Sequence, residues 1–135
     1  MQEKFTLTIY GLSNGNIPPK KNNKQMIWNG SRTIIIPSNK YKQWHEQESW
    51  NVRSQKPIKG IKRCKITYQF YTNDKRRRDA SNLIESINDL LVDNGVLVDD
   101  NWFVIEEMHI LPVVYDKDVK PHVDVEIYPL ANSDN

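Results

Sequence analysis

Cysteine is almost absent from this chain of 135 residues, because Cys64 is the only one. A single cysteine excludes a disulfide within the chain and any zinc site built from cysteine pairs. Long apolar runs are lacking too: no stretch approaches the ~18 residues of a membrane-spanning helix, and the first residues hold no apolar core of a secretory signal. We therefore expect one globular domain over residues 1–130 in the reducing cytoplasm, with a disordered tail at 131–135.

Acidic residues are scarce in the first half of the chain, and none occurs between Lys4 and His45. From Met1 to Arg78 there are 17 Lys and Arg against 4 Asp and Glu, whereas the remaining residues hold 2 against 13. This polarity indicates a basic surface for a polyanion beside an acidic region that could hold cations. Alternatively, the two halves neutralise each other as neighbouring strands, although this does not explain the dense cationic run at 75–78.

The first half predicts two strands and one helix. Residues 5–10 alternate apolar and hydroxyl side chains, as a half-buried strand does. Residues 11–32 are rich in Asn, Gly, Pro and Lys and predict a long loop, with Pro18-Pro19 in its middle. A short strand at 33–36 follows, and Ser38 is placed to cap a helix that runs to about Arg53.

The second half predicts a strand, a helix and two closing strands. Between residues 61 and 71, Cys64 falls on the apolar side of an alternating pattern, so it is expected in the core. Leucine and isoleucine recur at helical spacing from 79 to 93, and Gly95 stands where a helix commonly ends. Strands are expected at 102–111 and 122–128. The order β, β, α, β, α, β, β predicts an α+β fold, with two main helices packed on a single mixed sheet.

The charged residues at 75–79 and 99–100 are the candidates for a catalytic site. The cations Lys75, Arg76, Arg77 and Arg78 run directly into Asp79 at the start of the predicted helix, and Asp99-Asp100 follow that helix. Cations bind phosphates and carboxylates hold hard metal ions, so the pattern suits cleavage of a nucleic-acid backbone. Taken alone, Asp79 could be only a helix cap, and the arginines only a solvated loop. One of the two aspartates at 99–100 could likewise be only a surface turn.

The separation of Asp79 from Asp100 limits how they can share a metal ion. A helix over residues 81–93 is about 20 Å long, and the seven residues 94–100 span at most about 24 Å. A site within one chain therefore requires those seven residues to run almost straight back along the helix. Otherwise Asp100 would serve a site on a second subunit, which makes a composite site at a dimer interface the other open possibility.

Two segments resemble the RusA family of Holliday-junction resolvases: Arg-Arg-Arg-Asp-Ala-Ser-Asn-Leu at 76–83 and Asn-Gly-Val-Leu-Val-Asp-Asp at 94–100. Pro-Pro-Lys-Lys-Asn-Asn at 18–23 is similar to the family's Pro-Pro-x-x-Asn motif, and the likeness covers roughly residues 5–128. The family's central pattern is Arg-Arg-Asp-x-Asp-Asn-Leu. Its members are homodimers, many of them from phages, that cut four-way DNA junctions during recombination and repair with magnesium.

The resemblance implies a role for particular residues. Asp79 takes the place of the first catalytic aspartate and Asp100 that of the third, so both would hold Mg²⁺ or Mn²⁺. Ser81 stands where the second aspartate is usual, and Glu85 stands where a lysine is usual. Glu85 lies one turn beyond Ser81 and could restore the missing negative charge as a third ligand. The expected DNA-binding residues are Lys20, Lys21, Lys24, Lys75, Arg76, Arg77, Arg78 and Asn82.

Two other classes of function remain open. Because of Ser81, the chain could be a module that binds branched or duplex DNA and has lost catalysis. Its two oppositely charged halves could also make it a regulatory protein that docks on other proteins. The three histidines form no paired-histidine metal motif. No phosphate-binding or dinucleotide-binding glycine motif is present, so a nucleotide cofactor is not expected. A membrane is not expected as a partner either, because long apolar runs are lacking.

Overall fold

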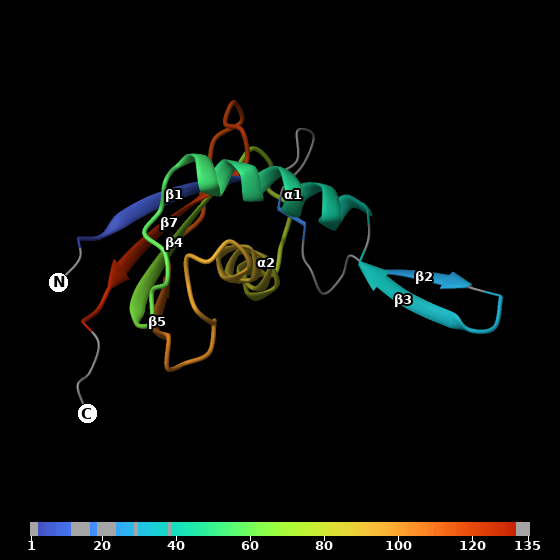
Figure 1. Cartoon of the computed structure of the whole chain (residues 1–135). Coiled ribbons are helices and arrows are strands. Elements are labelled where there is room, and N and C mark those ends of the chain that lie inside the picture. The colour runs from blue at the N-terminus through green and yellow to red at the C-terminus, as the bar shows by residue number, and fades with distance from the viewer. Residues whose placement is uncertain (1–2, 12–16, 19–23, 29, 38, 132–135) are drawn as a thin grey trace.

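The computed structural model describes residues 3–11, 17–18, 24–28, 30–37 and 39–131. The fold is α+β, as predicted: two helices accompany one mixed sheet of five strands, and a separate two-stranded hairpin lies apart from them (Figure 1). The elements, in chain order, are β1 Phe5–Tyr10, β2 Lys24–Trp28, β3 Thr33–Pro37, α1 Asn39–Ser54, β4 Cys64–Thr72, α2 Ala80–Asp93, β5 Ile105–Ile110, β6 Val114–Tyr115 and β7 His122–Pro129.

The sheet has the strand order β1-β7-β4-β5, and the short β6 also pairs with β4. β7 lies antiparallel to both β1 and β4, whereas β4 and β5 are parallel because α2 forms the crossover between them. Along β4, alternate side chains are buried, and Cys64 is fully buried as predicted. The sheet therefore presents one apolar face to the helices and one polar face to solvent.

The helix α2 covers the apolar face of the sheet. Its leucines and isoleucines enter one core with β4 and β7, and the buried members are Leu83, Ile84, Ile87, Leu90 and Leu91. Gly95 has a φ of +74° just past the helix, the left-handed conformation that glycine adopts without strain. The predicted bounds and cap of this helix are confirmed.

The helix α1 covers the free edge of β1. Trp44 donates to the carbonyl of Tyr10 (2.8 Å), and Glu48 accepts from the backbone N–H of Tyr10 (2.7 Å). Further along α1, Asn51 donates to the carbonyl of Thr8 (2.9 Å). These side chains satisfy backbone groups that an edge strand would otherwise expose to a second sheet.

One prediction in the first half is wrong. Residues 11–32 are not a continuous loop, because β2 occupies Lys24–Trp28 and pairs antiparallel with β3. The predicted cap Ser38 and most of the predicted tail at 131–135 lie outside the described residues. Within the described part of the chain, no helix is long and apolar enough to cross a membrane.

Candidate active site

The cationic segment before α2 is organised by a carboxylate that the sequence did not single out, Asp74. Arg78 donates to both of its carboxylate oxygens, at 2.7 and 2.9 Å, and the backbone N–H of Arg76 donates to it at 3.0 Å. The hydrogen bond from Arg78, followed by that from Arg76, holds the pKa of Asp74 well below its ordinary value. The spacing of four residues between Asp74 and Arg78 was the available signal. Arg78 is therefore half-buried, its charge is neutralised by Asp74, and the pair fixes the conformation of the segment before α2.

Asp79 caps the first turn of α2. Its Oδ1 accepts from the backbone N–H of Ser81 at 3.1 Å and from the Ser81 hydroxyl at 2.7 Å. A negative charge at this end is favoured by the helix dipole, so the carboxylate is held at a defined place. The capping role is confirmed, and it leaves the carboxylate exposed at the surface. Ser81 supports Asp79 directly, which is a positioning contact at the place where the family pattern has a second aspartate.

Glu85 and Asn82 lie on the outward side of α2, opposite its buried leucines. The position of Glu85 shows in its effect on Tyr41 of α1. Burial, a hydrogen bond to Asp89 and the charges of Asp89, Asp93 and Glu85 together raise the pKa of Tyr41. The Glu85 carboxylate therefore acts on the side of α2 that adjoins α1.

The second aspartate pair lies between α2 and a turn at 102–104. Asp99 accepts from the backbone N–H of Asp100 (2.7 Å) and from the Asn101 amide (2.9 Å), so its carboxylate is engaged by its neighbours. Asp100 is exposed, and neither of these hydrogen bonds occupies its carboxylate. Of the two aspartates, Asp100 is the better placed to offer oxygen atoms to a ligand.

The contacts of the segment after α2 indicate where Asp100 lies. The helix α2 runs from the carboxyl end of β4 back to its amino end. There the Ile61 N–H donates to the Val96 carbonyl (2.9 Å), Leu97 bridges to Ile61, and Ile105 pairs with Cys64. Asp100 lies within this return segment, whereas Asp79 precedes the helix. Burial and, to a smaller extent, the charge of Asp100 raise the pKa of Tyr68, whose hydroxyl donates to Asn88 of α2 at 2.6 Å, so Asp100 lies within electrostatic reach of the middle of the helix.

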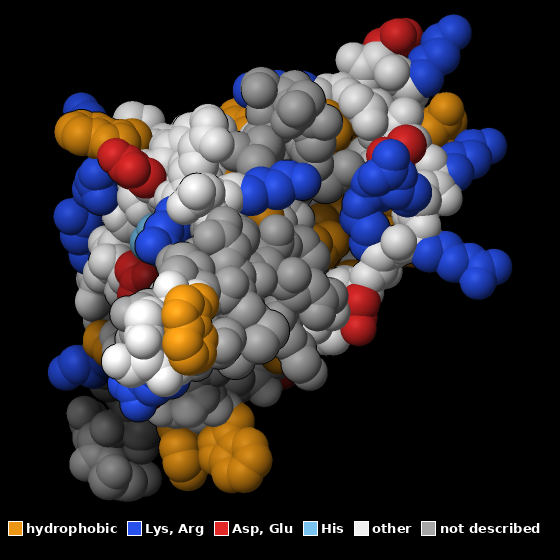
Figure 2. All heavy atoms as spheres, turned by 90° about the vertical axis from the view of Figure 1, so that its right-hand side faces the viewer, with side chains coloured by type: hydrophobic (Ala, Val, Ile, Leu, Met, Phe, Trp, Pro, Cys, Tyr) orange, Lys and Arg blue, Asp and Glu red, His pale blue; other side chains and the backbone are white. Residues whose placement is uncertain are grey.

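The remaining cations of the run are available to a polyanion. Arg76 and Arg77 are exposed, and no carboxylate among the described residues forms an ion pair with either. Lys75 lies over the Tyr115 ring, 5.0 Å from its centre. Figure 2 shows Lys and Arg side chains projecting around one face of the molecule. Lys20, Lys21 and the Lys24 side chain lie outside the described residues.

A second group of possible metal ligands was missed by the sequence reasoning. His45 of α1 and Asp89 and Asp93 of α2 offer atoms that all lie within 4.8 Å of one another. His45 Nε2 is 2.8 Å from Asp93 Oδ2, and the Tyr41 hydroxyl donates to Asp89 at 2.9 Å. These contacts also join the two helices. The three residues come together only because α1 packs on α2, so no sequence motif could have predicted the group.

The loop that precedes β2 is tied to α2 by a buried hydrogen bond. The hydroxyl of Ser86, which is fully buried, donates to the Pro18 carbonyl at 2.7 Å. The neighbouring Ile17 belongs to the core. Pro18, the first residue of the segment Pro-Pro-Lys-Lys-Asn-Asn, is therefore fixed against the helix that Asp79 caps.

Comparison with known protein families decides the affiliation of the chain. A family model described as Endodeoxyribonuclease RusA matches residues 15–128. The chain belongs to the RusA endodeoxyribonuclease family. No curated protein matches the sequence. The matched range of the RusA model includes Pro18, the cationic run, α2 and Asp100, so the features described above all fall within the family's own segment.

Proposed function

We propose that this protein is a metal-dependent endonuclease that resolves four-way DNA junctions. Membership of the RusA family supports deoxyribonuclease activity. The observation that carries the proposal is Asp79, an exposed carboxylate that is fixed by the first turn of α2 directly after three arginines. Its place beside cations that bind phosphate suits hydrolysis of a DNA backbone.

Carboxylate oxygens fit a hard divalent cation, and Asp79 and Asp100 are the residues that would hold it. Such an ion, Mg²⁺ or Mn²⁺, supplies a polarised phosphate oxygen and a more acidic water. The protein's own residues position the catalytic carboxylate and supply positive charge that binds the phosphates. Ser81 orients Asp79 through its hydroxyl and its backbone N–H, and Arg76 and Arg77 bind phosphates on either side of the cleaved bond. Glu85 lies one turn onward and adds negative charge to this end of the helix.

We further propose that the site is composite, with Asp79 from one subunit and Asp100 from its partner. Asp79 precedes the first turn of α2, whereas Asp100 follows the helix and acts on Tyr68 beside its middle, and this difference in position motivates the arrangement. Exposed apolar side chains on and near β5 also support it, because a second copy could cover them. They are Val98, Trp102, Phe103, Met108 and Ile110. Apolar surface of this kind is typical of subunit interfaces.

The test is cleavage of a labelled four-way junction with and without Mg²⁺. We expect paired symmetric nicks that depend on the ion, no cleavage by Asp79→Asn, and retained junction binding by that variant. Phe103→Glu should yield monomers in sedimentation and lose cleavage, whereas Trp50→Glu, which changes an exposed tryptophan on α1, should stay dimeric and active. Cleavage by Asp79→Asn at the wild-type rate would overturn the assignment.

The second candidate is a DNA-binding module without catalysis, which the serine at position 81 favours. It predicts salt-sensitive binding to junctions with no nicks in Mg²⁺ or Mn²⁺. The same assay separates the two functions. Restoration of the family's aspartate by Ser81→Asp would then create cleavage in the inactive protein.

A further inference from the structure

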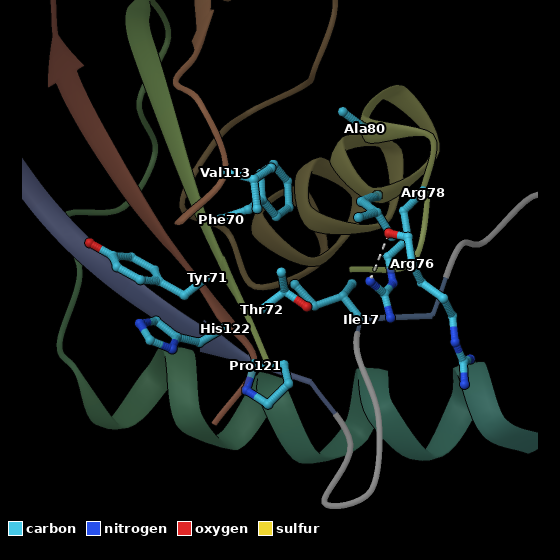
Figure 3. A pocket seen from close by; sticks show the side chains of 11 residues that line it. Ile17, Phe70, Tyr71, Thr72, Arg76, Arg78, Ala80, Val113, Pro121 and His122 are labelled. Carbon is cyan, nitrogen blue, oxygen red and sulfur yellow. Dashed lines mark hydrogen bonds between the residues drawn. The ribbon is translucent and has the colours of Figure 1, made fainter. Parts of the chain in front are cut away.

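An apolar pocket lies beneath the arginine run, between the end of β4 and the start of α2. It is a cavity of about 100 Å³. Figure 3 shows Phe70, Val113, Arg76 and Arg78 on one side of β4, whereas the rings of Tyr71 and His122 lie on its other side. Ala80, which follows Asp79 directly, also lines the pocket. The cavity is therefore adjacent to the carboxylate proposed for catalysis.

The pocket combines an apolar wall that includes the ring of Phe70 with the cations Arg76 and Arg78. Its buried inner wall is formed by Ile17, Phe70 and Leu83. Phe70 supplies its aromatic ring, whereas Tyr71, the next residue in β4, points to the opposite face of the sheet and stacks there on His122. Apolar and aromatic walls of this kind take a planar, weakly hydrated group.

The rim identifies the kind of molecule that carries this planar group. Arg78 is held by Asp74 and also donates to the Arg76 carbonyl at 3.4 Å, so the rim is fixed in place. Arg76 extends from it with no ion pair to any described residue. A flat apolar part joined to an anion is the chemistry of a nucleotide, whose base would enter the cavity while its phosphate meets Arg76.

We propose that this pocket receives the edge of one nucleobase that is unstacked at the branch point of the DNA. This inference rests on the proposed function and names a feature of the substrate that the same site recognises. The size of the cavity supports partial entry, because a cavity that encloses benzene measures about 150 Å³. A base at a branch point is less firmly stacked than one in a duplex, so its extraction costs less there. The pocket would therefore favour junctions over duplexes, and it would do so beside the catalytic carboxylate of Asp79.

The test couples a change in the pocket to a change in the DNA. Val113 lines the pocket and is exposed, so Val113→Phe narrows the cavity without disturbing the core. Val114 is its exposed neighbour outside the pocket lining, and Val114→Phe is the matched control. Binding is measured without Mg²⁺ on junctions that carry an abasic site at each branch-point position in turn, so that no cleavage intervenes.

We expect Val113→Phe to weaken junction binding about tenfold and to leave duplex binding unchanged. One abasic position should weaken wild-type binding by a similar factor. Val113→Phe should bind this abasic junction as tightly as it binds the intact junction. The narrowed pocket has already lost the contact with the base, so removal of the base costs nothing more. Val113→Ala and Val114→Phe should bind as the wild type does.

Three results overturn the inference. If both changes weaken binding independently, or if Val113→Phe binds junctions as tightly as the wild type, no base enters this pocket, while cleavage by the wild type continues to support the nuclease assignment. If the wild type binds junctions no better than duplexes, the proposed function fails together with the pocket.

Discussion

Removal of the Ser86 hydroxyl tests the link between α2 and the segment that precedes β2. In Ser86→Ala the Pro18 carbonyl loses its donor in a fully buried place. A buried carbonyl left without a partner costs about 1–3 kcal/mol of unfolding free energy. With a urea m-value of ~2 kcal/mol/M, a loss of ~2 kcal/mol lowers the unfolding midpoint by about 1 M. DNA affinity should fall as well, because the lysines at 20 and 21 directly follow this anchor.

The matched control is Ser54→Ala. Its hydroxyl donates to the Asn51 carbonyl at the same distance of 2.7 Å, but in an exposed setting. Surface changes of this kind usually alter stability by less than about 0.5 kcal/mol. Equal urea midpoints for the two variants would refute the reasoning, because burial of the hydrogen bond would then have no effect on stability.

Two further predictions concern titrating groups. Burial, with a smaller effect of the Glu106 charge, raises the pKa of the Cys64 thiol to about 11, so a thiol reagent at pH 8 should label it only in denaturant. Rapid labelling of the folded protein would contradict its place in the core. Arg78→Ala should return the lowered pKa of Asp74 toward its ordinary value, as followed by carboxyl NMR. The stabilisation by this pair is present above the unfolded carboxyl pKa of about 4 and is lost as the pH falls through the lower folded value. If Asp74 titrates near pH 4 in the wild type, Arg78 does not lower its pKa and this prediction is wrong.

The main sheet and α2 could be predicted because their patterns are local. Cys64 and its alternate neighbours in β4 marked the buried face, and the spacing of leucines marked α2. The strand β2 was missed because its flanking Lys, Asn and Pro residues are typical of loops. The Asn-Gly pair at 29–30, between two apolar runs, was the hairpin signal that could have revealed it. Gly30 has a φ of +94° in the connection between Trp28 and Thr33, a left-handed conformation that glycine adopts without strain.

The candidate site was predictable only in part. Asp79 followed from its place after the arginines, and its capping role from the start of helical periodicity. The partner of Arg78 could have been read from its spacing to Asp74. By contrast, the group formed by His45 with two aspartates of α2 depends on how α1 packs against α2, and tertiary packing leaves no periodic trace in the sequence.

The composite site can be tested most directly by mixing two inactive variants. Asp79→Asn and Asp100→Asn are unfolded together, refolded and assayed on a four-way junction with Mg²⁺. If each site takes Asp79 from one subunit and Asp100 from the other, a mixed dimer contains one unaltered site, and nicking of single strands returns. A mixture that is as inactive as either variant alone, beside an active wild type refolded in the same way, would contradict the composite site.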